Sequence, residues 1–276
     1  MRRFLVFRLY GPMAAWGDIA VGEQRPSTPH PSKSAILGLL AAALGIRRHE
    51  DDKHQSLADG YGYAVRVDAA GILLRDYHTT QIPESTSRSR HLRTRRDETR
   101  DRSNLYTVLS TRDYRGDALY TVCLAENPGS RYSLETLAEH LNRPRFPLYL
   151  GRKSCPLAFP LSPRCISAET FEEALTRYDA EQTEAQRQCV ENLKEALNKS
   201  SPSGRGLGEG ILDQSVAQLA SPKHALGAGN SECDFYWETG MTDSKPLHTV
   251  PRQDLPLSRR RWQFGKRNEH YRRGGA

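Results

Sequence analysis

The chain has 276 residues, 37% of them hydrophobic and 26% charged, with a formal net charge of +7. This length allows a substantial core in one large domain or two small ones, and the composition is that of a polar globular protein. The five cysteines form no Cys-x-x-Cys pair, and their odd number argues against a zinc site or a disulfide framework.

We therefore expect reduced thiols in a cytoplasmic chain, with no cofactor and no metal. The first residues lack the apolar region of a signal peptide, and the apolar run Ala35–Ile46 is too short to cross a membrane. Most basic residues are arginines, which suit bidentate phosphate contacts and base stacking. A basic soluble protein without a nucleic-acid partner is the alternative.

The N-terminal 46 residues predict a strand, a rigid loop and a buried helix. Residues 3–9 have strand character, and the loop that follows contains several glycines and prolines. Residues 33–46 are predicted to form an apolar helix that can end at Gly45. This helix opens on Ser32, Lys33 and Ser34, with Arg25 nearby. Since a helix N-terminus presents free N–H groups and a positive dipole end, we expect phosphate to bind there.

The next elements complete a β-α-β-β-α order with returning strands. Strands are predicted at 61–68, 72–80, 106–110 and 118–125, and helices at 133–141 and 171–178. This order matches an α+β, ferredoxin-like arrangement, interrupted by a polar arm at about 81–105.

The arm is dense in arginine. It carries Arg88, Arg90, Arg93, Arg95, Arg96, Arg100 and Arg102. Such a segment cannot bury a core, but it can wrap a polyanion and become ordered on contact. A solvated loop is the alternative. The position between two strands favours a hairpin extension that grips a partner.

Two segments flank the arm at its base. We expect residues 75–79 to face residues 111–115, which would bring together Arg75, Tyr77, His78, Arg112 and Tyr114. Paired arginines and tyrosines would supply phosphate contacts and stacking faces for RNA. The alternative is that Asp76 and Asp113 pair with these arginines across the strands.

A third cluster, residues 149–156, combines an aromatic residue, a glycine and two basic residues: Tyr149, Gly151, Arg152 and Lys153. A glycine there lets the backbone approach a ligand closely. An ordinary turn with exposed basic residues is the alternative reading.

The C-terminal third is expected to differ from the rest. We predict a ferredoxin-like domain at 1–178, a polar and partly flexible insertion at 179–234 with a helix at 183–198, and a small β-rich lobe with a basic tail at 235–276. The last part contains strands near 235–237, 248–250 and 262–264, and an Arg259-Arg260-Arg261-Trp262 cluster.

No hydrolase, P-loop or metalloprotease motif is present in the sequence. The one candidate catalytic group is His78 with Tyr77 and Lys153, which would act as base and charge stabiliser in a metal-independent ribonuclease. A lone histidine in such a place is more often structural or an RNA contact.

Three blocks together resemble a known family. They are residues 9–46, residues 74–79 with their facing strand, and Pro147–Pro156, with a weaker match at Val250–Gln253 followed by Trp262. They are similar to the CasD family of CRISPR-associated RAMP-type subunits, the type I-E family of the Cascade surveillance complex. Residues 179–234 and the arm sequence depart from that family's pattern.

The resemblance implies a modified ferredoxin-like (RRM-like) fold with a protruding thumb and no catalysis. It implies a subunit that holds the 5′ handle of the CRISPR RNA, caps the backbone filament, and contacts the adjacent backbone subunit and the large subunit. Target DNA would be met only through the complex, and no membrane is involved. The residues expected to bind RNA are Arg25, Ser32, Lys33, Ser34, Arg75, Tyr77, His78, Arg112, Tyr114, Tyr149, Gly151, Arg152 and Lys153. The alternative is an endoribonuclease that processes repeat RNA.

Overall fold

The computed structural model describes the chain apart from residues 21, 84–93, 101, 103–104, 185–232 and 275–276. The strands are β1 (Arg2–Tyr10), β2 (Met13–Ala14), β3 (Gln24–Arg25), β4 (Tyr61–Ala69), β5 (Ile72–Pro83), β6 (Leu105–Gly116), β7 (Leu119–Glu126), β8 (Arg164–Ala168), β9 (Cys233–Glu238), β10 (His248–Ser258) and β11 (Gln263–Gly274). The helices are α1 (Lys33–Leu44), α2 (Asp51–Gly60), α3 (Arg95–Glu98) and α4 (Leu134–Asn142), and residues 171–184 are also helical.

Antiparallel pairing dominates this mixed α/β structure. A seven-stranded sheet has the order β10-β11-β9-β4-β7-β1-β8, and each neighbouring pair in it is antiparallel. Its first four strands in the chain are β1, β4, β7 and β8, with α1 and α2 between β1 and β4 and with α4 between β7 and β8. The predicted β-α-β-β-α order with a returning strand is therefore confirmed.

The sheet is covered on both faces at its centre. Leu5, Phe7 and Leu9 of β1 pack in the core beneath α1, whereas Phe4 and Val6 pack in a second core with the helix at 171–184. Since successive side chains of a strand point to opposite faces, the consecutive apolar residues Phe4–Phe7 of β1 serve both cores. This explains why the first strand lacks the alternation of a half-exposed strand.

Helix α1 is the central element of the larger core. Its N-cap is Ser32, whose side chain accepts a hydrogen bond from the N–H of Ala35, and it ends at Gly45, which has a φ of 77°. The left-handed conformation there is one that glycine adopts without cost, so the predicted end of the helix is confirmed.

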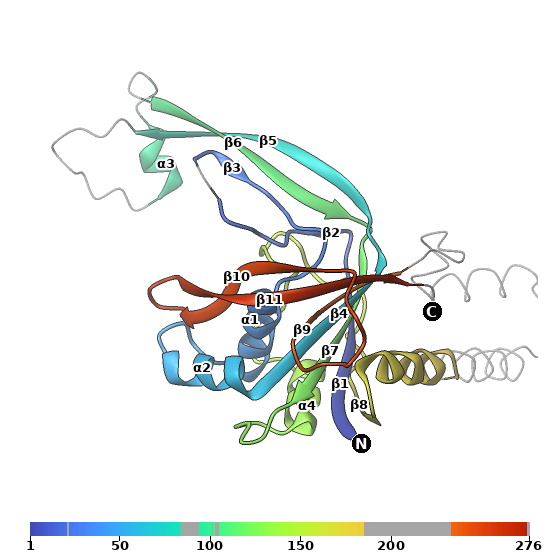
Figure 1. Ribbon diagram of the computed structural model, residues 1–276. Helices are drawn as coiled ribbons and strands as arrows, with labels where there is room; N and C mark the ends of the chain where they lie inside the picture. Colours follow the sequence, from blue (N-terminus) through green and yellow to red (C-terminus); the bar gives the residue numbers. More distant parts are fainter. Residues whose placement is uncertain (21, 84–93, 101, 103–104, 185–232, 275–276) are drawn as a thin grey trace, which may run out of the picture.

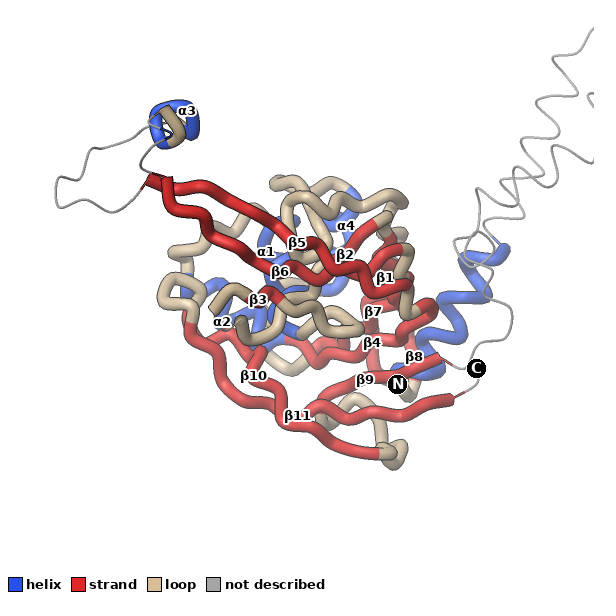
Figure 2. Tube along the Cα trace, turned by 90° about the horizontal axis from the view of Figure 1, so that it is seen from above, coloured by secondary structure: helices blue, strands red, loops and turns tan. Residues whose placement is uncertain are grey.

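The strands β5 and β6 form a long hairpin that leaves the main body, with α3 at its far end (Figures 1 and 2). Their ladder runs from Ile72 opposite Gly116 to Pro83 opposite Leu105, so both strands are longer than predicted. The short strands β2 and β3 pair with β6 and tie the base of this arm to the body. The predicted polyanion contacts of Arg88, Arg90 and Arg93 lie outside the described residues.

The C-terminal strands continue the main sheet. β9 pairs with β4, β11 with β9, and β10 with β11 (Figure 1). The strands expected in a separate small lobe are thus hydrogen-bonded to the central sheet, and most of the predicted insertion lies outside the described residues. The division into 1–178, 179–234 and 235–276 stays a prediction.

A buried network of charged groups fastens β9, β10 and β11 to α1. The Lys33 ammonium lies 2.9 and 3.0 Å from the two carboxylate oxygens of Glu238, and the Lys33 N–H donates to Asp254 at 2.9 Å. Arg267 binds Asp254 and Glu269 at 2.7 Å each. Every one of these groups has an oppositely charged partner, which is the condition for burying charge.

Glu269 is the most buried carboxylate of this network, with 3% of its surface exposed. Burial alone would raise its pKa. The hydrogen bond from His30 and the charges of His30, Arg267 and Arg252 outweigh burial and hold the pKa of Glu269 well below its usual range. Its charged form therefore stabilises the folded chain above the pKa that glutamate has in the unfolded chain, about 4.3.

We predict that Glu269→Gln lowers the free energy of unfolding by about 3 kcal/mol at pH 7, because it removes the carboxylate paired with Arg252 and one of the two carboxylates paired with the buried Arg267. The folded-state pKa is depressed, so the wild-type advantage is full above pH ~4.3 and shrinks by up to ~1.4 kcal/mol per pH unit below it. Urea unfolding of both proteins between pH 7 and pH 3.5 measures this difference in stability.

Glu173→Gln is the control, because Glu173 forms an exposed ion pair with Arg177. This substitution should cost under ~1 kcal/mol. An equal difference between Glu269→Gln and wild type at all pH values would contradict the account.

Candidate functional site

The N-terminus of α1, where the sequence predicts a phosphate site, is already occupied by the protein's own carboxylates. Lys33 is only 5% exposed, its ammonium is paired with Glu238, and its N–H is bonded to Asp254. The structure thus contradicts the exposure that the predicted role of Lys33 requires. A surface lysine was expected, but its two partners come from β9 and β10, far along the chain.

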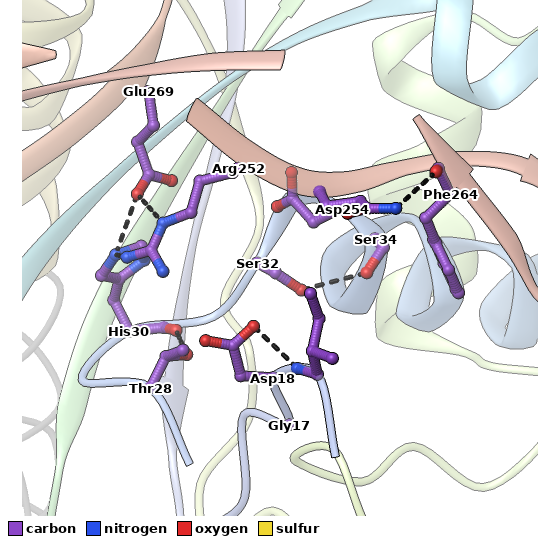
Figure 3. A pocket seen from close by; sticks show the side chains of 12 residues that line it. Gly17, Asp18, Thr28, His30, Ser32, Ser34, Arg252, Asp254, Phe264 and Glu269 are labelled. Atoms are coloured by element: carbon purple, nitrogen blue, oxygen red, sulfur yellow. Dashed lines mark hydrogen bonds and ion pairs between the residues drawn. The ribbon is translucent and has the colours of Figure 1, made fainter. Parts of the chain in front are cut away.

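A small cavity of about 170 Å³ adjoins this helix end. In Figure 3, the carboxylates of Asp18, Asp254 and Glu269 lie around it together with His30 and Arg252. Three carboxylates oppose the approach of an anion, so this cavity is a poor site for phosphate.

A second and larger hollow of about 620 Å³ lies along the side of α1. We call it the α1 groove. Its floor is made by small residues of α1, including Ala35, Gly38 and Ala42. Its walls come from residues 15–26, residues 146–152, and the β10–β11 turn with the start of β11. It contains six of the residues predicted to bind RNA, namely Arg25, Ser32, Ser34, Tyr149, Gly151 and Arg152.

The lining of the α1 groove is basic and aromatic. Four arginines line it, Arg25, Arg48, Arg152 and Arg259, against one acidic residue, Asp18. The aromatic residues are Phe146, Tyr149, Trp262 and Phe264. An excess of positive charge in a hollow concentrates anions there, and aromatic faces accept stacked bases.

Arg152 is held at the junction of three segments. Its Nη2 donates to the carbonyl of Arg25 at 3.3 Å, and its guanidinium carbon lies 4.7 Å from the ring centroid of Tyr114. Its Nη1 is buried and has no hydrogen-bond partner among the described residues. Tyr114 is only 9% exposed, so it supports Arg152 and does not offer the free stacking face that the sequence predicted.

Gly151 is needed for a close approach, but the neighbour is protein backbone and not a ligand. Its φ is 83°, and a Cβ at this position would lie 1.8 Å from the carbonyl oxygen of Ala15. The N–H of Ala15 donates to the carbonyl of Leu150 at 3.0 Å. These contacts fix residues 149–152 against residues 14–16 as one wall of the groove.

At the base of the arm, the predicted facing of residues 75–79 and 111–115 is confirmed by the register of β5 and β6. Arg75 binds Asp113 at 2.8 and 3.2 Å, and its hydrogen bond and charge lower the pKa of Asp113. This is the cross-strand pairing weighed as the alternative. Tyr77 is 67% exposed, and His78 lies 3.9 Å from Asp76.

The arm base and the α1 groove are adjacent but separate. Arg112 of β6 is the register partner of Arg25 of β3, which lines the groove. Arg75, Tyr77, His78 and Arg112 do not themselves line it. Lys153 is exposed, and among the described residues no hydrogen bond or ion pair joins it to Tyr77 or His78. The described residues include no group of three or more metal-binding side chains and no helix able to cross a membrane.

The residues that the sequence reasoning did not assign to the site are Arg48, Phe146, Arg259, Trp262 and Phe264. Arg259 and Trp262 belong to a basic cluster visible in the sequence, where it was placed in a C-terminal lobe. Only the pairing of β9 with β4, followed by β11 and β10, brings that cluster back to α1.

Comparisons with known proteins agree on one family. The family model described as CRISPR-associated protein (Cas_Cas5) matches residues 4–269. The chain belongs to this Cas5 family. It is 35% identical over 188 residues to the CRISPR system Cascade subunit CasD of Escherichia coli (strain K12), an alignment that covers 65% of this chain and 78% of that protein.

Two solved structures share the fold of this Cas5 family member. One, titled CRISPR RNA-guided surveillance complex, is 23% identical with a TM-score of 0.57 and covers 99% of this chain and 90% of its own. The other, titled Crystal structure of Cas protein, is 23% identical with a TM-score of 0.52 and covers 99% of this chain and 95% of its own.

We predict that Gly151→Ala costs about 3 kcal/mol of stability, because it combines a positive φ with a collision against the Ala15 carbonyl. Gly129 is the matched control, since it has the same φ of 83° but open space around it, and Gly129→Ala should cost only about 1 kcal/mol. Thermal unfolding of the two variants compares them. Equal melting temperatures would show that the contact with Ala15 does not position this wall.

Proposed function

We propose that this Cas5 family member is a non-catalytic subunit of a type I-E Cascade surveillance complex in the cytoplasm. It holds the 5′ handle of the CRISPR RNA, caps the backbone filament, and contacts the adjacent backbone subunit and the large subunit in antiviral defence. The family membership and the 35% identity to a Cascade subunit support the complex. The observation that carries the RNA-binding role is the α1 groove, with its four arginines and four aromatic residues.

The groove suits single-stranded RNA better than a double helix. Guanidinium groups at its walls can bind phosphates in bidentate fashion, and these contacts would set the position of the strand. Exposed rings such as Tyr149 and Phe146, at 38% and 41% exposure, offer faces to unpaired bases. Arg25, Arg152 and Tyr149 keep the roles that the sequence predicts, and Ser32 and Ser34 are assigned as hydroxyl contacts on the floor.

We infer that the four strands β4, β7, β1 and β8 with α1 and α4 are a modified ferredoxin-like domain. Its strand order and antiparallel pairing support this assignment. The β5–β6 arm is the thumb of this domain. It exposes apolar side chains on both of its faces, Ile72 and Leu74 on one and Leu73 and Tyr77 on the other, and these suit a contact with a neighbouring backbone subunit.

The non-catalytic assignment is supported by the placement of the candidate catalytic groups. Tyr77 and His78 lie on β5 outside the α1 groove, and within the part of the chain that the structure describes His78 forms an ion-pair contact with Asp76 alone, at 3.9 Å. We predict that purified protein leaves repeat RNA intact in buffer containing EDTA, as followed by gel electrophoresis. Specific cleavage that His78→Ala abolishes would contradict the proposal in favour of a metal-independent endoribonuclease.

We predict that Arg152→Ala weakens binding of the repeat-derived 5′ handle RNA about ten-fold at 150 mM salt, because a charge-assisted phosphate contact is lost. The slope of log affinity against log salt should fall by about one. Fluorescence anisotropy with 3′-labelled RNA measures both. Arg177→Ala is the control, because Arg177 is an exposed arginine outside the groove that is paired with Glu173. Equal affinities of wild type and Arg152→Ala would contradict the placement of RNA in this groove.

A further inference from the structure

Trp262 occupies an unusual position for a tryptophan. The chain has three tryptophans, and Trp16 and Trp237 are each 1% exposed, whereas Trp262 is 59% exposed. It lies in the turn between β10 and β11 with a φ of 53°, in the left-handed region that bulky residues rarely adopt. A large apolar ring is thus held open to solvent at the edge of the α1 groove, in a strained backbone conformation, which is a feature of functional sites.

The surrounding contacts fix this ring in place. The guanidinium carbon of Arg48 lies 4.2 Å from the ring centroid of Trp262, and the Nε of Arg48 donates to the carbonyl of Arg259 at 2.9 Å. The turn is anchored to α2, since Asp51 accepts hydrogen bonds from Ser258 Oγ at 2.9 Å and from the N–H of Arg260 at 3.3 Å. Arg48 therefore supports the indole, and the rest of the ring stays available.

A second cation, Arg259, lines the same groove as Trp262, with its guanidinium carbon 5.8 Å from the ring centroid of Phe264. Arg259 donates from Nη2 to the carbonyl of Ser34, and its guanidinium lies 3.4 Å from the position that a Cβ on Gly38 would take. Its Nε is buried and has no hydrogen-bond partner in the part of the chain that the structure describes. Burial and the charge of Arg48 lower the pKa of Arg259. An anion bound beside Arg259 would oppose this shift, because a negative charge stabilises the protonated guanidinium.

The groove thus contains an exposed indole and a guanidinium whose Nε has no partner among the described residues. The chemistry that matches this combination is that of a nucleotide, with a flat base and a phosphate. We propose that Trp262 is a base-stacking platform of the α1 groove, on which one unpaired base of the bound RNA rests while Arg259 binds a flanking phosphate. This proposal rests on the proposed function, and it adds a subsite that binds a base of the RNA rather than its sugar-phosphate backbone. The absence of a side chain at Gly38 gives Arg259 room to reach the groove floor.

The three tryptophans make this subsite directly observable. Because Trp16 and Trp237 are buried, a base that stacks on the protein surface should quench the emission of Trp262 alone. The test titrates the full-length chain with single-stranded handle RNA, and with a series of the same RNA in which each position in turn is abasic. Affinity is measured separately by anisotropy of the 3′-labelled RNA, so that binding and stacking are read independently.

We expect intact RNA to quench the tryptophan emission, and one abasic position to abolish the quenching. Trp262→Leu should weaken binding of intact RNA about ten-fold but leave the affinity for that abasic RNA unchanged, and Trp262→Tyr should restore most of the loss. Arg48→Gln should weaken binding of intact RNA through loss of ring support, and circular dichroism of each variant verifies the fold.

RNA binding without any change in tryptophan emission, or with unchanged affinity of Trp262→Leu, would overturn this inference and leave the proposed function standing. Quenching by an isolated partner subunit without RNA would reassign Trp262 to a protein contact and overturn it as well. Absence of RNA binding by the wild-type chain would contradict the proposed function itself.

Discussion

The contact on which the structure depends is the buried pairing of Lys33 with Glu238 and Asp254. It joins the first turn of α1 to β9 and β10, which are separated from Lys33 by 205 and 221 residues in the chain. Buried ion pairs contribute little net stability compared with apolar packing, but breaking one leaves a charge without a partner. Such a contact selects one arrangement of the C-terminal strands, and that arrangement completes the α1 groove.

The same contact decides where the molecule presents positive charge. An open N-terminus of α1 would attract phosphate through its dipole and free N–H groups. Asp254 and Ser32 satisfy those groups from within the protein, and Asp18 and Glu269 add negative charge nearby. The positive charge lies instead along the side of α1, in the α1 groove. It comes from Arg25 of β3, from Arg48 and Arg152 of the loops, and from Arg259 of the β10–β11 turn.

Local features were predictable from the sequence, and long-range pairing was not. The strand at 3–9, the start of the helix at residues 32–34 and its end at Gly45 are set by neighbouring residues, and all three were predicted correctly. The register between residues 75–79 and 111–115 also follows from a hairpin. Lys33 was misassigned because its partners lie in β9 and β10. Gly151 was correctly identified as a close-approach position, but only the fold reveals that Ala15 is what it approaches.

The most direct test of this account is photo-crosslinking of the chain to its handle RNA, followed by mass spectrometry of the crosslinked peptides. If the α1 groove holds the RNA, the crosslinks should fall in two segments distant in sequence, 146–152 and 259–264, with residues 25 and 48 as further positions. Crosslinks confined to the β5–β6 arm or to the helix at 171–184 would contradict the account, because neither segment lines the groove.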